Sequence, residues 1–232
     1  HEFGAACMAD AYARVSGKLG VVLATSGGGA LNLAPGLAES FASRVPVLAL
    51  VGQPPLGLEG TGAFQETSGK AGTFPLEAVY APLTKYCRKL TDISELPQAL
   101  EAAINAAITA PQGPVVLILP KDLQQKELEV PCLARVAAPV EASVHPFSRL
   151  ALAEKLKAHA GHIVFILGEG IVRAGAQAEI KTLVNRCGAK VATTVEGKSA
   201  FSPLDPAFVG LAGIMGHATV RTELLRAELC VL

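Results

Sequence analysis

The sequence predicts an α/β protein made of two open parallel-sheet domains, with helices on both faces of each sheet. Apolar runs of strand length alternate with longer helical patterns along the 232 residues. These runs are apolar throughout, which is typical of parallel strands that are covered on both faces. Hydrophobic residues make up 50% of the chain and charged residues 17%, so buried cores are expected and disorder is not.

These patterns predict six strands and two helices. The first helix should be capped by Ser94 and the second by Ser148, because apolar residues recur at helical spacing after each serine. Alternation of strands and helices favours parallel sheets with right-handed crossovers. The expected strands are residues 21–25, 47–51, 115–119, 163–167 and 190–194, and a further strand is expected at 228–232.

A polar stretch with repeated prolines divides the chain. Residues 121–126 are mostly polar, and Pro131, Pro139 and Pro146 interrupt the next twenty or so positions. Repeated helix breakers without periodicity indicate a linker. We therefore expect a first domain at 1–122, a linker at 123–147 and a second domain at 148–232. Because the chain begins inside a motif and stops inside a strand, we expect the N-terminus of the first domain and the C-terminus of the second to be missing.

Composition argues against several classes of function. The 20 basic and 20 acidic residues cancel and form no basic patch, so neither nucleic acid nor a membrane is an expected partner. No apolar stretch is long enough to span a bilayer, and no secretory signal opens the chain. The five cysteines are dispersed without CxxC spacing. We therefore expect no metal ligands in this chain, no disulfide framework and a cytoplasmic location.

Three motifs carry most of the functional information. The chain opens on His1-Glu2, and the run 21–25 leads into Thr25-Ser26-Gly27-Gly28-Gly29-Ala30-Leu31-Asn32-Leu33. A glycine-rich turn between a strand and a helix N-terminus is a common ligand site in open α/β sheets. The third motif is Gly60-Thr61-Gly62-Ala63-Phe64-Gln65-Glu66. Over residues 1–125, these motifs resemble in order and spacing the pyrimidine-binding domain of thiamine-diphosphate-dependent enzymes similar to the acetolactate synthase large subunit.

The resemblance implies a role for Glu2. In this family the carboxyl group at this position activates the cofactor by hydrogen-bonding its aminopyrimidine ring. Such a carboxyl lies in an apolar pocket that raises its pKa. Without the resemblance, Glu2 would be interpreted as an acidic residue stabilised by a helix N-terminus.

The same resemblance implies further site residues. Phe64 and Gln65 would line the substrate pocket. Gly28 stands where the family usually has proline, which removes a fixed φ and loosens the turn. The residues expected to contact the cofactor are Glu2, Thr25, Gly28, Gly29, Asn32 and Gln65.

Residues 148–232 resemble the central, Rossmann-like domain of the same enzymes. Its nucleotide loops would contain Gly168, Gly170, Thr194 and Val195. Glu196, Lys198 and Met215 depart from the pattern of the flavin-binding synthases, which argues against FAD and leaves it as an alternative.

Together the resemblance implies a fragment of a thiamine-diphosphate-dependent 2-oxo acid decarboxylase or carboligase, hence a transferase or lyase, that forms a homodimer or homotetramer. The family holds Mg²⁺ and the cofactor diphosphate with a Gly-Asp-Gly motif, which does not occur in this sequence. We therefore expect the metal ligands in another domain and this chain alone to be inactive. Two alternatives are a dinucleotide-binding module, suggested by Gly168-x-Gly170 and Glu196, and a non-catalytic member of the family.

Overall fold

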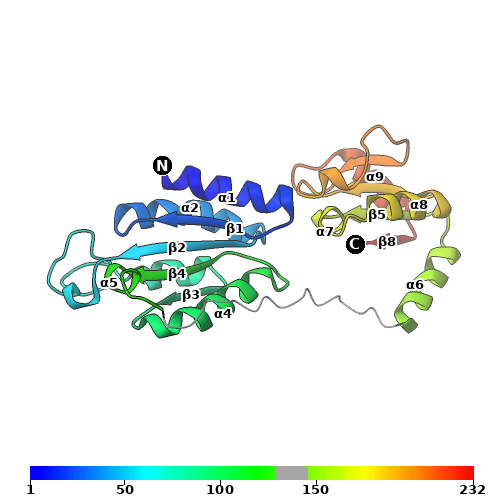
Figure 1. Cartoon of the computed structure of the whole chain (residues 1–232). Coiled ribbons are helices and arrows are strands. Elements are labelled where there is room, and N and C mark those ends of the chain that lie inside the picture. The colour runs from blue at the N-terminus through cyan, green and yellow to red at the C-terminus, as the bar shows by residue number, and fades with distance from the viewer. Residues whose placement is uncertain (129–145) are drawn as a thin grey trace. The chain divides into compact units, whose positions relative to one another are not determined.

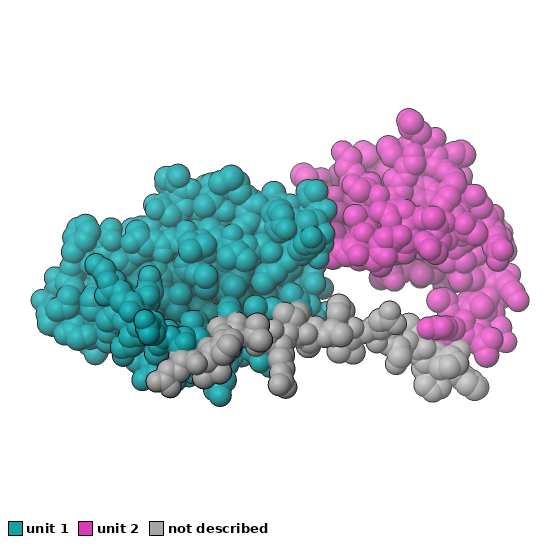
Figure 2. Space-filling model, in the orientation of Figure 1, with its two compact units in different colours: residues 1–141 teal, residues 142–232 magenta. Residues whose placement is uncertain are grey.

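A computed structural model describes residues 1–128 and 146–232. The chain divides into two compact units, His1–Glu141 and Ala142–Leu232, which are coloured separately in Figure 2. The division falls inside the expected linker at 123–147. Most of that linker lies outside the described residues, so the domain boundaries expected from the sequence stay predictions.

Unit 1 contains a four-stranded parallel sheet in the order β1-β2-β4-β3. The strands are β1 (Gly20–Ala24), β2 (Val47–Gln53), β3 (Tyr86–Lys89) and β4 (Val115–Pro120). Its helices are α1 (Glu2–Ser16), α2 (Gly28–Ala42), α3 (Leu76–Tyr80), α4 (Leu96–Ile108) and α5 (Lys121–Gln124), with 3₁₀ turns at Leu56–Leu58, Ala81–Leu83 and Ile93–Glu95. Ala24 pairs with Val51, and Gln53 pairs with Pro120, so these three strands end at the same edge.

The two faces of this sheet belong to different cores. In β2, Val47, Ala49 and Val51 pack into a cluster with residues of α1, α2 and α3. Leu48 and Leu50 point the other way and join residues of α4. Figure 1 shows α1 and α2 on one face and α4 on the other. The uninterrupted apolar run of β2 therefore reflects burial on both faces, as expected for a parallel strand.

Small residues bring α1 and α2 close together. A Cβ on Gly36 would lie 2.6 Å from Cβ of Ala6, so a larger residue there would force the helices apart. A buried hydrogen bond of 2.7 Å from Ser40 Oγ to Asp10 also joins them. This close packing places the start of α1 beside the first turns of α2, where the functional residues lie.

Strand β1 differs from the expectation that both of its faces are covered. Val21 is 50% exposed and Leu23 is 69% exposed, whereas Val22 is buried. Helix α4 packs against β2, β3 and β4. Among the described residues, no helix packs in this way against the same face of β1. An apolar run was therefore not sufficient to establish burial on both faces.

Unit 2 contains a second four-stranded parallel sheet, in the order β7-β6-β5-β8. Ile163, Phe165 and Leu167 of β5 share a core with α8, while Ile166 faces α9 from the opposite side. Its strands are β5 (Ile163–Leu167), β6 (Lys190–Thr193), β7 (Phe208–Leu211) and β8 (Leu229–Val231), and its helices are α6 (Pro146–Ala158), α7 (Glu169–Arg173), α8 (Gln177–Cys187) and α9 (Ala218–Arg226), with a 3₁₀ turn at Lys198–Ala200.

The predicted fold class, two open parallel sheets with helices on both faces, is confirmed, and each expected strand is present. Two strands were not predicted. β3 contains Arg88 and Lys89, because it is an edge strand that tolerates charge. β7 is irregular, because Val209 is left out between the Phe208–Val191 and Gly210–Ala192 pairs, and Gly210 has a φ of +128°.

Both predicted helix caps were wrong. The carboxylate of Asp92 accepts a hydrogen bond of 2.8 Å from the backbone N–H of Ser94, so Asp92 caps the 3₁₀ turn that precedes α4. Helix α6 begins at Pro146, which puts Ser148 inside its first turn. Among the helices of the described residues, none is long and apolar enough to cross a bilayer.

Candidate functional site

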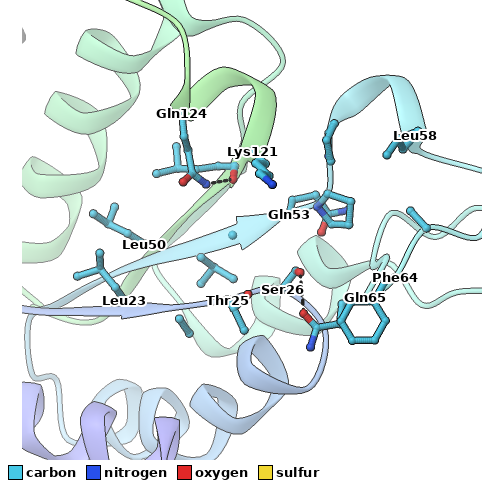
Figure 3. A pocket seen from close by; sticks show the side chains of 17 residues that line it. Leu23, Thr25, Ser26, Leu50, Gln53, Leu58, Phe64, Gln65, Lys121 and Gln124 are labelled. Carbon is cyan, nitrogen blue, oxygen red and sulfur yellow. Dashed lines mark hydrogen bonds between the residues drawn. The ribbon is translucent and has the colours of Figure 1, made fainter.

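A pocket of about 630 Å³ opens at the carboxyl edge of the unit 1 sheet (Figure 3). Thr25 and Ser26 follow β1, Gln53 ends β2, and Lys121 follows β4. These strands are adjacent and parallel, so the residues that follow them converge, as is usual for ligand sites of open α/β sheets. Apolar side chains such as Leu23, Leu50 and Leu58 form much of the wall, and Lys121 is the only charged residue that lines the pocket within the described part of the chain.

The turn after β1 lies directly against the loop that carries Gln65. Gly27 has a φ of +64°, and a Cβ there would lie 2.7 Å from Cβ of Gln65. The hydroxyl of Ser26 donates a long hydrogen bond of 3.4 Å to Oε1 of Gln65, and the two side chains face each other in Figure 3. Only glycine satisfies both the backbone conformation and the close approach at position 27.

Phe64 and Gln65 both line the pocket but differ in exposure and in backbone conformation. Phe64 is 88% exposed although it lines the pocket. Gln65 is half-buried and has a φ of +58°, an uncommon conformation for a residue that is not glycine. The prediction that these two residues occupy one site is consistent with this geometry.

Glu2 lies at the start of α1 beside the first turns of α2. The side-chain amide of Asn32 donates a hydrogen bond of 3.1 Å to Oε2 of Glu2. A Cβ on Gly29 would lie 3.0 Å from Oε1 of Glu2 and 2.8 Å from Cγ2 of Thr25. Glu2, Thr25, Gly29 and Asn32 therefore form one cluster, and the absence of a side chain at Gly29 keeps the carboxylate accessible.

The expected rise in the pKa of Glu2 is not found in this structure. The hydrogen bond from Asn32 lowers the pKa of Glu2 below its ordinary value, because that bond favours the ionised form. Glu2 is half-buried at a helix end and lies outside the lining of the apolar pocket, so desolvation is the weaker effect.

Gly28 and Thr25 also belong to the residues expected to contact the cofactor, and the structure places them differently. Gly28 is exposed at the first position of α2, and a Cβ there would meet nothing within 4 Å. Thr25 is shared, because it lines the pocket and also lies near Glu2 through Gly29.

Four residues at this edge were not predicted as site residues from the sequence, namely Ser26, Gly27, Gln53 and Lys121. Gln53 ends β2, Lys121 directly follows β4, and Ser26 and Gly27 lie in the turn after β1. This position at a strand's carboxyl end is the signal that could have identified them, because ligand sites of open α/β sheets lie there.

The predicted nucleotide loops of unit 2 lie close together. The backbone of Gly197 packs against Gly168, since a Cβ there would lie 2.7 Å from the carbonyl carbon of Gly168. Thr194 Oγ1 accepts a hydrogen bond of 3.0 Å from the Gly197 N–H, and Val195 is exposed. Two pockets of about 720 and 500 Å³ are described in this unit, and neither is lined by Gly168, Gly170, Thr194 or Val195.

Two family models match this chain. Residues 1–71 match the family description "Thiamine pyrophosphate enzyme, N-terminal TPP binding domain". Residues 151–232 match "Thiamine pyrophosphate enzyme, central domain". The chain belongs to the thiamine pyrophosphate enzyme family. The matched N-terminal range includes Glu2, the Gly27–Gly29 turn and the loop with Phe64 and Gln65.

Curated relatives of this family are similar over nearly the whole chain. The acetolactate synthase large subunit of Corynebacterium glutamicum is 34% identical over 233 residues, which cover 100% of this chain and 36% of that protein. A probable acetolactate synthase large subunit of Methanocaldococcus jannaschii is 36% identical over 93% of this chain and 36% of its own length. The acetolactate synthase of Arthrospira platensis is 36% identical over 99% of this chain and 39% of its own length. The chain thus spans somewhat more than a third of the curated relatives that it matches.

Proposed function

We propose that this chain supplies the aminopyrimidine side of the active site of an acetolactate synthase-like enzyme, which decarboxylates a 2-oxo acid and transfers the resulting acyl unit. The observation that carries the proposal is the Glu2–Asn32 pair at the Gly29 opening, inside the range that matches the N-terminal TPP binding domain. Bound thiamine diphosphate would supply the electron sink that this chemistry needs after carbon dioxide has left.

The residues around Glu2 fit an aromatic amine ring. Asn32 holds Oε2 of Glu2, while Oε1 lies at the opening above Gly29. A ring nitrogen at this opening would hydrogen-bond to Oε1. A bound ring would exclude water from the half-exposed carboxyl of Glu2, which would raise its pKa and let Glu2 share a proton with the ring. In the site without such a ring, the pKa of Glu2 is lowered.

The pocket beside this cluster fits a small 2-oxo acid. Its walls are apolar, which suits an alkyl group, and Lys121 provides one positive charge for a carboxylate. Gln65 and Ser26 provide polar groups near the turn that connects the pocket with the Glu2 cluster. Phe64 would close the exposed side of the pocket over the substrate.

The remaining parts of the proposal concern groups outside this chain. Mg²⁺ and the cofactor diphosphate would be held by another domain, with the active site completed in a homodimer or homotetramer. The chain alone would then be inactive. A cytoplasmic location stays a prediction, since the yeast relative is described as mitochondrial and the maize relative as chloroplastic.

A direct test uses the isolated chain. A 4-aminopyrimidine added to isotope-labelled protein should shift the side-chain amide signal of Asn32, and Glu2→Gln should abolish that shift. Glu39 is an exposed carboxylate on α2, so Glu39→Gln is a matched control that should leave the response unchanged. A saturable shift that persists in Glu2→Gln would contradict the role of Glu2.

Activity requires a longer protein. In a chimera, this chain would replace the matching segment of the Corynebacterium glutamicum enzyme, and acetolactate formation from pyruvate would be measured. Activity that is lost in Glu2→Gln supports catalysis. A chimera that binds thiamine diphosphate but forms no product would identify a non-catalytic family member.

The dinucleotide-binding alternative is less compatible with unit 2. The helix after Gly168 ends at Arg173 after only five residues, and Gly175 has a φ of +64°. A nicotinamide fingerprint needs glycines that lead into a longer helix whose N-terminus meets the diphosphate. Tight NAD binding by calorimetry would restore this alternative.

A further inference from the structure

The carboxylate of Glu66 lies inside the loop that carries Phe64 and Gln65. Its side chain accepts hydrogen bonds from the backbone N–H groups of Gly60 at 2.6 Å, Gly62 at 3.1 Å and Ala63 at 3.2 Å, and from the hydroxyl of Ser68. Glu66 is only 5% exposed. Four donors on one carboxylate, three of them backbone groups, organise the segment 60–68 around a single ionised side chain.

The conformation that this carboxylate supports is unfavourable by itself. Gln65 has a φ of +58°, in a region that glycine or asparagine occupies at lower cost. The adjacent turn is closed from both sides, because the Glu66 N–H donates to the Ala63 carbonyl at 3.1 Å while the Ala63 N–H donates to the Glu66 carboxylate. The chain thus keeps a long amide side chain at a strained position, next to the residue whose carboxylate binds the preceding backbone.

The next residue along the chain fixes the loop to the sheet. The hydroxyl of Thr67 donates a hydrogen bond to Oε1 of Gln53, and the carbonyl of Thr67 accepts one of 3.0 Å from the Leu76 N–H. Gln53 ends β2 and is 3% exposed. Glu66 therefore lies between a fixed anchor at Thr67 and the two residues at the pocket, Phe64 and Gln65.

We propose that Glu66 is a positioning residue, which holds Phe64 and Gln65 over the pocket by binding the backbone of residues 60–63. It touches neither the cofactor nor the substrate in this role. The consequence for catalysis rests on the proposed function, whereas the positioning itself is a property of the chain. The positioning role of Glu66 and its effect on catalysis can therefore be tested separately.

The chain contains no tryptophan, so a single tryptophan at position 64 would report on this loop alone. In the Phe64→Trp background, Glu66→Gln keeps the side-chain shape but removes the charge. It also places an NH₂ group, which can only donate, next to the N–H and O–H donors that the carboxylate bound. The matched control is Glu95→Gln, which changes a glutamate that pairs with Arg88 and Thr91 before α4. The readouts are fluorescence anisotropy and amide hydrogen exchange at Gly60, Gly62 and Ala63.

We expect Glu66→Gln to lower the anisotropy and to accelerate exchange at these three amides about tenfold, while the amides of β2 and β4 stay protected. Glu95→Gln should change neither. Ser68→Ala removes one of the four donors, so it should give a smaller change in the same direction even if Glu66→Gln does not fold. Unchanged exchange at the three amides, or an equal increase throughout unit 1, would overturn the proposal.

The chimera with the Corynebacterium glutamicum enzyme adds a kinetic readout. Glu66→Gln should lower kcat/KM for pyruvate about 10- to 100-fold, because misplaced pocket residues no longer orient the substrate. The affinity for thiamine diphosphate should fall much less than kcat/KM, because Gln65 is the one expected cofactor contact in this loop and the Glu2–Asn32 pair belongs to a different segment. Equal losses in cofactor affinity and turnover would indicate general destabilisation and contradict positioning. An inactive parent chimera would count against the proposed function, and exchange and anisotropy would still decide the role of Glu66.

Discussion

The side-chain amide of Asn32 donates a hydrogen bond of 3.1 Å to the carboxylate of Glu2, and this bond is the main reason why the pKa of Glu2 is lowered. The two residues are 30 positions apart and come from the starts of two different helices. Their contact depends on the close packing of α1 and α2 at Ala6 and Gly36. The position of the Glu2 carboxylate therefore depends on a helix contact that lies outside the site itself.

Removal of this amide should raise the pKa of Glu2. In Asn32→Ala the pKa should rise toward the ordinary value of 4.5, which carboxyl carbon shifts in an NMR titration would measure. Because the folded-state pKa is lowered, the stability gained from Glu2 is present above about pH 4.5 and is lost as the pH falls through the folded-state pKa. Asn185→Ala, in helix α8 of unit 2, is the control and should leave the titration unchanged.

Two adjacent glycines should respond differently to the same substitution. Gly27→Ala adds a Cβ only 2.7 Å from Gln65 at a φ of +64°, so it should destabilise the chain by about 1–3 kcal/mol. Gly28→Ala adds a Cβ in open space at the start of a helix, so it should be neutral or stabilise by up to about 1 kcal/mol. Urea unfolding of both variants measures the difference. Equal midpoints would contradict the close contact between the turn and the Gln65 loop.

Lys121 should affect substrate binding more than turnover. It is the only charged residue in the pocket lining of the described part of the chain, and a charge-assisted hydrogen bond to a carboxylate is lost in Lys121→Met. In the chimera we expect KM for pyruvate to rise about tenfold with a smaller change in kcat, whereas Lys121→Arg keeps most of the affinity. A fall in kcat at constant KM would indicate a different role.

The cysteines should differ sharply in reactivity. Burial, together with the nearby charge of Glu77, raises the pKa of Cys87 from 9.0 to about 12, whereas Cys7 and Cys230 are exposed. Since the thiolate is the reactive form, Cys87 should be alkylated by iodoacetamide at pH 8 at least about 100-fold more slowly than Cys7. Peptide mass spectrometry would resolve the rates, and similar rates at both sites would contradict the burial of Cys87.

The same shift has a consequence for alkaline stability. The unfolded chain loses the Cys87 proton near pH 9 and the folded chain only near pH 12, so unfolding becomes easier as the pH rises between these values. Cys87→Ala should reduce this loss of stability. An unfolding midpoint with the same pH dependence in both proteins would oppose the assignment.

Much of the fold could be predicted because its strands are local apolar runs. Strands such as β2 and β5 were recognisable from five consecutive apolar residues. β3 and β7 were not, since an edge position permits Arg88 and Lys89 and a bulge permits Gly210. Likewise, the sequence did not show that Val21 and Leu23 are exposed, because exposure depends on which helix lies over which strand.

The sequence by itself determined the fold class and the thiamine pyrophosphate enzyme family, because each depends on residues that are close together in the chain. Only the tertiary structure decided the direction in which the pKa of Glu2 is shifted, the contact between Gly27 and Gln65 and the environment of Glu66. A pKa or a close approach depends on atoms within a few ångströms, and helix packing and loop closure bring those atoms together from positions that are distant in the sequence.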